Sequence, residues 1–307
     1  MSKLRQDARA FRQRVKMGRT RLWVIVEGVG HDRAFYDDVV HAATQPAVPK
    51  YSIRLAESIS LDGVSAGGKA HALSLYQYFE KSNALVQENA EVRVAVSFFL
   101  DRDDDEFAGS LVKNDHVVYT KHSDVEAEIF ANGDAFRAVG NAFGVGRTLV
   151  DPIRDATGSP LNALAEVWRD WIRLRLLAIA CGAVQGNRFS QGSKINEQQY
   201  GVLDQEAAQD LLDAMSRTVA DGSWEARVAD VDAYLEQVYS RQTEATLVRG
   251  KWLAGYLRHL LKTGLPKEQL PANVTDHAIV VACLASIDFG EPWVDHYREG
   301  ISRILTS

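Results

Sequence analysis

The first 130 residues alternate short apolar runs with segments in which apolar residues recur every three or four positions. Apolar runs bounded by turn residues predict buried strands, and the longer spacing predicts amphipathic helices. The expected strands cover residues 21–28, 50–59, 92–100 and 116–122, and the expected helices cover residues 31–43, 67–84 and 123–133. Strands that alternate with helices indicate βα units, so we expect a Rossmann-like α/β domain with a parallel sheet of about four strands.

The pattern changes beyond about residue 131, where strand-like runs give way to long stretches with helical spacing. The clearest of these stretches are residues 161–182 and 249–264. We therefore expect a mainly α-helical C-terminal half. The predicted organisation is an N-terminal arm at 1–20, an α/β domain at 21–130 and a helical domain at 131–307.

The N-terminal arm has a charge that differs from the rest of the chain. The formal net charge is −6, yet the first 21 residues contain eight Lys or Arg residues and one acid, Asp7. Leu4, Ala8, Phe11 and Val15 fall at helical spacing, which predicts an amphipathic helix with a basic outer face. That face is either simply solvated or binds phosphate.

Composition narrows the class of protein. With 307 residues, 46% apolar and 25% charged, the chain is typical of a globular protein and unlike a fibrous or disordered one. Cys181 and Cys283 are far apart and show no zinc or redox spacing. No stretch reaches the roughly 20 apolar residues of a membrane span, and the polar N-terminus has no signal-peptide pattern, so we expect a cytoplasmic protein without membrane contact.

Ligands of parallel α/β sheets bind beyond the carboxyl ends of the strands, and three polar stretches follow the expected strands. They are EGVGHD at 27–32, LDGVSAGGKA at 61–70 and LDRDDDEF at 100–107. The first stretch lacks the third glycine of a dinucleotide-binding turn and begins with an acid, Glu27, where a pyrophosphate would approach. It is therefore poorly suited to a dinucleotide.

The second stretch contains a possible P-loop. Gly63, Gly68 and Lys69 fit the pattern G-x-x-x-x-G-K, and Asp101 can be interpreted as a Walker B aspartate. However, Ala70 occupies the position of the Ser or Thr that coordinates magnesium in P-loops. A P-loop nucleotide-binding protein remains an alternative hypothesis.

The third stretch suggests a metal site. Asp101 and Asp103 are spaced i, i+2, and in an extended backbone their side chains would point the same way. Glu27 at a neighbouring strand end would complete a cluster of three carboxylates. Hard oxygen ligands of this kind suit Mg²⁺ or Mn²⁺, which can activate water for phosphodiester hydrolysis.

Several motifs resemble those of toprim domains, which occur in topoisomerases, bacterial primases and OLD nucleases. The motifs are VEGVGHDRAFY, GGKAHAL, FLDRDDD, SDVEAEIF and RGKWL, in this order. Together they resemble the bacterial toprim-like branch that includes the nuclease effector of the PARIS anti-phage system. The resemblance covers roughly residues 20–130 and a short stretch near Lys251.

The resemblance implies roles for individual residues. Glu27 would be the toprim glutamate, acting as a general base or metal ligand, and Asp101 and Asp103 would be the metal ligands of the D-x-D motif. Glu126 either completes the metal site or forms a capping box with Ser123 at the start of a helix. Lys251 would hold the scissile phosphate or stabilise charge in the transition state.

The function implied by the resemblance is Mg²⁺- or Mn²⁺-dependent cleavage of RNA, with tRNA as one candidate, or of DNA. The protein would be a toxic effector of anti-phage defence controlled by an ABC-type ATPase, and it could act as a homodimer. The alternatives from other classes are the P-loop protein and a non-catalytic interaction module whose carboxylates are helix caps and solvated loop charges.

Overall fold

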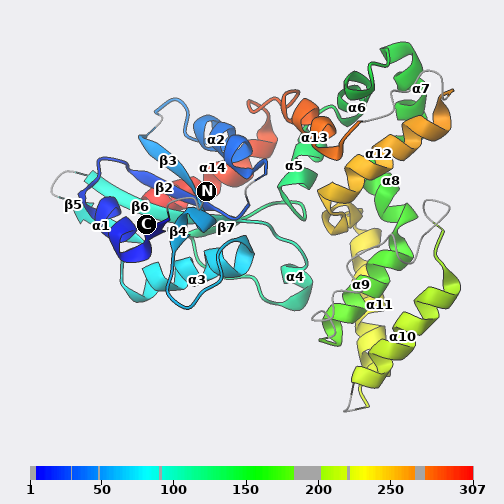
Figure 1. Cartoon of the computed structure of the whole chain (residues 1–307), viewed down its shortest axis with the longest axis horizontal. Coiled ribbons are helices and arrows are strands. Elements are labelled where there is room, and N and C mark those ends of the chain that lie inside the picture. Colours follow the sequence, from blue (N-terminus) through cyan, green and yellow to red (C-terminus); the bar gives the residue numbers. More distant parts are fainter. Residues whose placement is uncertain are drawn as a thin grey trace. The chain divides into compact units, whose positions relative to one another are not determined.

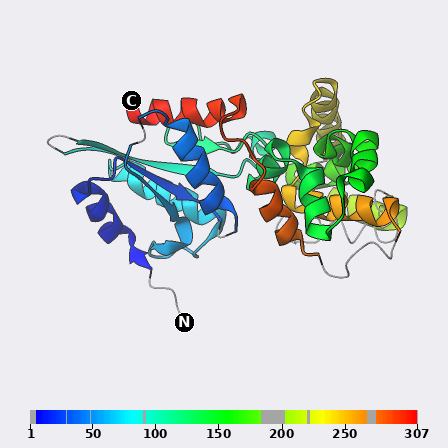
Figure 2. The ribbon, with the colours of Figure 1, turned by 90° about the horizontal axis from the view of Figure 1, so that it is seen from above.

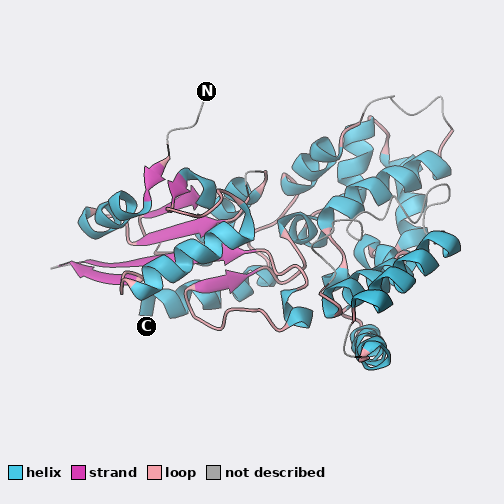
Figure 3. Ribbon diagram, turned by 60° about the horizontal axis from the view of Figure 1, so that its bottom comes forward, coloured by secondary structure: helices cyan, strands magenta, loops and turns pink. Residues whose placement is uncertain are grey.

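The computed structural model describes residues 5–28, 30–47, 49–89, 92–182, 202–219, 222–266 and 274–306. The chain divides into two compact units. The first unit contains Met1–Arg102, Val112–Asn132 and Ile287–Ser307, and the second contains Asp103–Leu111 and Gly133–Ser286. Figure 3 shows that the strands belong to the first unit, whereas the second unit is helical.

The first unit is built on a five-stranded sheet. Its strands are β2 (Leu22–Val26), β3 (Tyr51–Leu55), β5 (Val86–Asn89), β6 (Val92–Leu100) and β7 (Val117–Tyr119). They run in the order β3-β2-β6-β5, and β7 also pairs with β6. All pairings are parallel except that of β5 with β6. The predicted α/β fold with a mostly parallel sheet is confirmed.

Helices cover both faces of this sheet (Figure 1). One face carries α1 (Ala8–Met17) and α3 (Gly68–Lys81), and the other carries α2 (Asp32–Ala43) and α14 (Asp295–Thr306), as the second view also shows (Figure 2). The expected N-terminal helix is confirmed as α1, whose Phe11 ring lies 5.3 Å from Trp23 and 5.9 Å from Phe79. Leu4 lies outside the described residues.

The C-terminal helix differs from the expected domain organisation. The boundary expected near residue 130 lies close to Asn132, but residues 287–307 return to the first unit instead of joining the helical one. Tyr297 of α14 is 1% exposed, and its ring lies 6.1 Å from Tyr36 and 6.2 Å from Phe99. The helix lies close to β7 at Gly300, where an added Cβ atom would lie only 3.1 Å from the Val118 side chain.

Two short strands were not expected, and one expected strand is divided in two. β1 (Gln6–Asp7) and β4 (Ile59–Ser60) form a separate two-stranded parallel sheet. The expected strand at 50–59 is therefore interrupted, because the 3₁₀ turn η1 (Ala56–Ser58) separates β3 from β4. β5 has the sequence VQEN and no alternation of apolar residues, so nothing in its sequence indicates that it is a strand paired with β6.

The predicted helical character of the C-terminal half is confirmed in the second unit. Its α-helices are α4 (Asp105–Ala108), α6 (Ala135–Phe143), α7 (Arg147–Thr157), α8 (Pro160–Val167), α9 (Arg169–Ala180), α10 (Gln205–Thr218), α11 (Trp224–Ser240), α12 (Gly250–Gly264) and α13 (Asp276–Leu284). The 3₁₀ turn η4 (Glu244–Leu247) belongs to this unit, and α5 (Val125–Asn132) and η6 (Pro292–Val294) belong to the first. Across the described residues, no helix combines the length and apolar character needed to cross a membrane.

Replacing Tyr297 by Ala should lower the free energy of unfolding by about 3–5 kcal/mol, because it leaves a cavity between α14, α2 and β6. Urea denaturation measures the change. Arg298→Ala is the matched control on the same helix; Arg298 is exposed and pairs with Asp295, so its removal should change stability by no more than about 0.5 kcal/mol. Equal effects of the two substitutions would contradict the packing described for α14.

Candidate functional site at the carboxyl edge of the sheet

The order of the strands creates a natural binding position in the first unit. The chain leaves β2 for β3 on one side and later returns to β6 on the other side of β2. Ligands of open α/β sheets bind beyond the carboxyl ends of the strands at such a switch point. Val26 pairs with Phe99, and the next residues along the two strands lead to Glu27 and Asp101. Two predicted site residues thus follow adjacent strand ends.

The turn after Glu27 is closed by a hydrogen bond. The backbone N–H of Gly28 donates to Asp32 Oδ2 at 2.7 Å. A Cβ at Gly28 would lie 2.8 Å from Asp32 Oδ1, so any larger residue here would displace the Asp32 carboxylate. Burial raises the pKa of Asp32, and the hydrogen bond from Gly28 opposes that shift. Asp32 therefore fixes the backbone next to Glu27 in addition to beginning α2.

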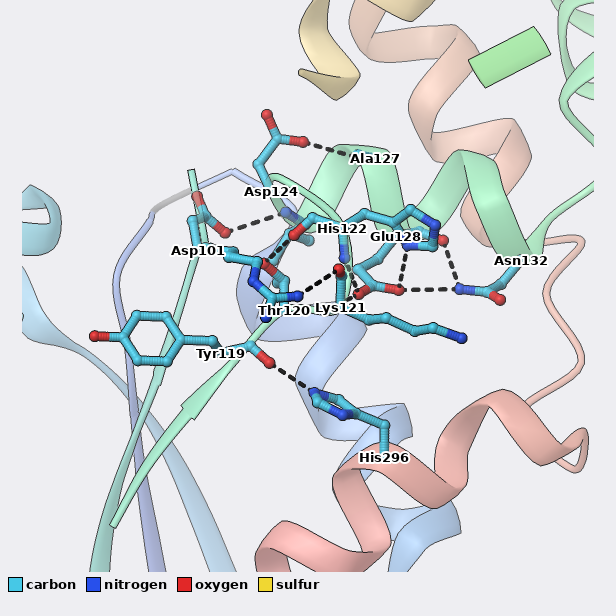
Figure 4. Close-up of polar contacts among 12 residues, drawn as sticks. Asp101, Tyr119, Thr120, Lys121, His122, Asp124, Ala127, Glu128, Asn132 and His296 are labelled. Carbon is cyan, nitrogen blue, oxygen red and sulfur yellow. Dashed lines mark hydrogen bonds and ion pairs between the residues drawn. The ribbon is translucent and has the colours of Figure 1, made fainter. Parts of the chain in front are cut away.

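Asp101 is joined to the segment that follows β7 (Figure 4). The backbone N–H of Val125 donates to Asp101 Oδ1 at 3.1 Å, which directs the carboxylate toward the N-terminus of α5. Next to it, the N–H of Arg102 donates to Thr120 Oγ1 at 2.8 Å, and this hydroxyl donates to the carbonyl of His122 at 2.7 Å. The end of β6 and the β7–α5 turn are thus held together.

Glu126 lies in the first turn of α5, but it does not form the expected capping box. The helix begins at Val125, and the Oδ1 atom of Asp124 accepts a hydrogen bond from the N–H of Ala127 at 2.8 Å. The capping interpretation of Ser123 and Glu126 is therefore wrong, because the neighbouring aspartate caps the helix. A Cβ at Gly30 would lie 3.9 Å from Glu126 Oε1, so this carboxylate reaches the turn that follows Glu27.

The most completely buried carboxylate of this edge, Glu128, was not singled out from the sequence. It is 1% exposed and accepts hydrogen bonds from the backbone N–H groups of Lys121 and His122 and, at 3.2 Å, from Asn132 Nδ2 (Figure 4). Its Oε2 atom also lies 3.2 Å from His122 Nδ1. Glu128 thereby fixes the turn between β7 and α5.

The ionised form of Glu128 is stabilised by these contacts. Burial alone would raise the pKa of Glu128, but His122 and the backbone N–H groups of Lys121 and His122 outweigh burial and lower it. Burial also raises the pKa of Tyr297 well above its ordinary value, and the charge of Glu128 adds to this. The sequence signal for Glu128 is its position three residues after the buried Val125, on the inward face of α5.

The remaining aspartates of the acidic run lie in the second unit, and Asp103 does not have the expected backbone conformation. Asp103 has a φ of 46°, so the expectation of an extended Asp101–Asp103 pair with side chains pointing the same way is wrong. Asp104 pairs with Arg175 Nη2 at 2.8 Å and with Arg249 Nη2 at 3.1 Å. Asp104 is thus an ion-paired residue of the second unit that directly precedes α4, and Asp105 is the first residue of that helix.

The two arginines around Asp104 are themselves anchored within the second unit. Arg175 is 5% exposed, donates to the carbonyl of Leu247 at 2.9 Å and lies 4.9 Å from the Trp252 ring centroid. Arg249 Nη2 also lies 4.0 Å from Asp103 Oδ1. The next basic residue, Lys251, is exposed in the first turn of α12, so the helix expected over residues 249–264 is confirmed. Its catalytic role stays a prediction.

The glycine-rich stretch does not have the setting of a P-loop. It follows β4, which belongs to the small sheet and not to the main one. Gly63 and Gly68 have positive φ values of 75° and 72°, and Lys69 lies in the first turn of α3. The backbone N–H of Gly67, at the start of this helix, donates to His71 Nδ1 at 2.9 Å. A donor that would face phosphate in a P-loop is therefore used internally.

The predicted metal ligands are not assembled into one closed group. Glu27, Asp101 and Glu126 belong to the first unit and Asp103 to the second. Among the described residues, no three His, Cys, Asp or Glu side chains lie close enough together to hold a metal ion.

No protein-family model matches the chain, and no curated protein matches it. A function for this site is therefore inferred from its geometry and from the types of its donor atoms.

Replacing Glu128 by Gln should lower the free energy of unfolding by about 3 kcal/mol at neutral pH, because it removes the charge that faces His122 and the two N–H groups. The lowered pKa of Glu128 means that its stabilisation is present above the pKa of an unfolded glutamate and is lost on acidification. The difference between wild type and variant should therefore be present at about pH 5 and shrink below about pH 4.3. Urea unfolding across this pH range measures it.

The matched control is Glu126→Gln, two residues away on the same helix. Glu126 is half-buried and does not cap α5, so its neutralisation should change stability by no more than about 1 kcal/mol. A pH-independent difference between wild type and Glu128→Gln would show that Glu128 is not ionised in the folded protein.

Proposed function

We propose that the protein is a metal-dependent nuclease of the toprim type that hydrolyses phosphodiester bonds in RNA or DNA. The observation that carries the proposal is the position of Glu27 and Asp101 after the two strands that flank the switch point of the sheet. Glu126 supports it, because its carboxylate reaches the turn after Glu27. The toprim-like order of motifs in the sequence is consistent with this arrangement.

The donor set fits Mg²⁺ or Mn²⁺ in its chemistry, since it consists of carboxylate oxygens at a sheet edge. Glu27 and Asp101 would hold the ion, with Glu126 as a further donor from the first unit. When bound, such an ion neutralises charge on the phosphate and lowers the pKa of water. Asp103 has a weaker case as a ligand than Asp101, because Arg249 already faces its carboxylate.

The residues of the chain would contribute orientation and proton transfer. Glu27 is half-buried after β2 and would accept a proton from the attacking water. The hydrogen bond between Gly28 and Asp32 would hold the adjacent backbone in place, and the N–H of Val125 would orient Asp101. The buried Glu128 would support this arrangement through the β7–α5 turn without contacting substrate.

The biological setting remains a proposal that depends on the toprim-like resemblance. In that setting the nuclease is a toxic effector of anti-phage defence, and an ABC-type ATPase controls it. The competing P-loop hypothesis is less compatible with the structure, because Ala70 has no hydroxyl and the N–H of Gly67 is bonded to His71.

Glu27→Gln and Asp101→Asn should each reduce cleavage by at least about a hundredfold, because each removes a charged oxygen donor from the switch point. The assay measures cleavage of labelled total RNA and of plasmid DNA by the full chain with Mg²⁺ or Mn²⁺. The presumed ATPase partner is added with the substrates where cleavage requires it. Thermal unfolding of each variant checks that the fold is retained.

Asp105→Asn and Lys69→Ala are the controls. Asp105 belongs to the same acidic run but begins α4 of the second unit, and Lys69 belongs to the glycine-rich stretch. Both variants should retain cleavage. Loss of activity only in Lys69→Ala, together with measurable ATP binding, would instead favour the P-loop hypothesis.

A further inference from the structure

Three arginines gather around the edge strand of the main sheet. Arg54 lies on β3, Arg14 on α1 and Arg33 in the first turn of α2. The guanidinium carbons of Arg54 and Arg14 lie 5.6 Å and 5.7 Å from the centroid of the Trp23 ring. Two separate elements thus direct cations at one indole, and Arg33 is close enough to act electrostatically on Arg54.

No carboxylate neutralises this cluster within the part of the chain that the structure describes. Arg154, Arg173 and Arg258 each form an ion pair, but Arg14, Arg33 and Arg54 form none. Arg54 Nε is buried without a hydrogen-bond partner among the described residues. Burial lowers the pKa of Arg54, and the charges of Arg14 and Arg33 lower it further. Like charges held together in this way favour the binding of an anion.

The cluster lies beside the strand that leads to the candidate site. Arg54 pairs in register with Ile25, two residues before Glu27 on the neighbouring parallel strand. Arg33 follows the turn that begins with Glu27. Both residues therefore lie toward the carboxyl end of the sheet. A polyanion bound along the β3 edge would extend toward the switch point between β2 and β6.

The exposed face of α1 extends the positive surface. Arg9, Arg14 and Lys16 are exposed on this helix, which contains no acidic residue, and Asp7 caps its N-terminus. The acid next to Arg33, Asp32, accepts a hydrogen bond from Gly28. The next acids along the helix, Asp37 and Asp38, form no ion pair with Arg33. The α1 helix itself thus carries only basic charged residues, although the formal net charge of the chain is −6.

We propose that Arg14, Arg33 and Arg54, together with the outer face of α1, bind the phosphodiester backbone of the nucleic-acid substrate. This inference rests on the proposed nuclease function for the identity of the polyanion. Guanidinium groups suit this role, because their planar N–H donors match phosphate oxygens and their charge does not titrate. Contacts of this kind position a nucleic acid without reading its sequence.

The test measures binding separately from cleavage. The full-length chain carrying Arg14→Gln, Arg33→Gln and Arg54→Gln is titrated in EDTA against fluorescently labelled single-stranded and duplex oligonucleotides at several salt concentrations. Each lost phosphate contact reduces the slope of log affinity against log salt by about 0.7–0.9, so the triple variant should lose about 2–3 units of slope. Its affinity should fall at least about tenfold at roughly 50 mM salt.

Two further variants separate the role of charge from a general effect. The triple Lys variant keeps three cations and should keep most of the slope, although its affinity can fall because lysine lacks the planar fork. The double variant Arg298→Gln, Arg303→Gln removes exposed arginines of the same unit that pair with Asp295 and Asp115, and it should bind like wild type. Thermal unfolding verifies that all variants are folded.

An unchanged salt slope in the triple Gln variant would overturn the proposal, as would a wild-type chain that binds neither oligonucleotide. Equal binding of polyglutamate and oligonucleotide at matched charge would also overturn it and indicate an acidic protein partner instead. Failure of the nuclease proposal has a different signature: the wild type would bind the oligonucleotides through the three arginines but cleave neither RNA nor DNA when metal is added.

Discussion

The parallel pairing of β2 with β6 is the constraint on which the rest of the first unit depends. All five residues of β2 are buried, and each pairs with β3 on one side and β6 on the other. A strand buried on both faces and paired along both edges has little freedom to change register, because a shift by one residue would exchange the side chains packed on its two faces and disrupt its pairing with β3 and β6. The positions of Glu27 and Asp101 follow from this fixed register.

The free-energy cost of placing carboxylates at this edge is offset by backbone donors. The N–H of Gly28 bonds to Asp32, the N–H of Val125 bonds to Asp101, and two N–H groups bond to Glu128. Each of these donors comes from a turn or from the first turn of a helix, where it has no partner within regular secondary structure. The turns and the carboxylates therefore stabilise each other, and neither arrangement is expected to persist without the other.

The sequence predicted the parts of the molecule in which local pattern and tertiary structure agree. β6 at Val92–Leu100 was predicted because its long apolar run is buried in the sheet. β5 was not predicted, because its polar residues pair through backbone atoms alone. The role of α14 was also missed: its helical pattern is visible, but nothing in its spacing indicates that the chain returns to the first unit.

The candidate site likewise contains residues that the sequence pattern indicates and residues that only the folded structure reveals. Glu27 and Asp101 were recognisable because each follows an apolar strand, whereas Glu128 owes its importance to contacts with His122 and Asn132 that only the folded turn creates. The backbone at Asp103 was misinterpreted as extended, because a run of acids gives no indication of where the backbone turns.

The fate of that acidic run follows from a change of compact unit in the middle of it. Asp101 follows β6 of the first unit and accepts an N–H from α5, whereas Asp104 belongs to the second unit and faces two arginines. Identical side chains three residues apart thus meet different partners, a backbone N–H in one case and two guanidinium groups in the other. A carboxylate held by two guanidinium groups has little capacity left to bind a cation. The surroundings of each aspartate, and not its place in a D-x-D pattern, therefore favour Asp101 as a metal ligand over Asp104.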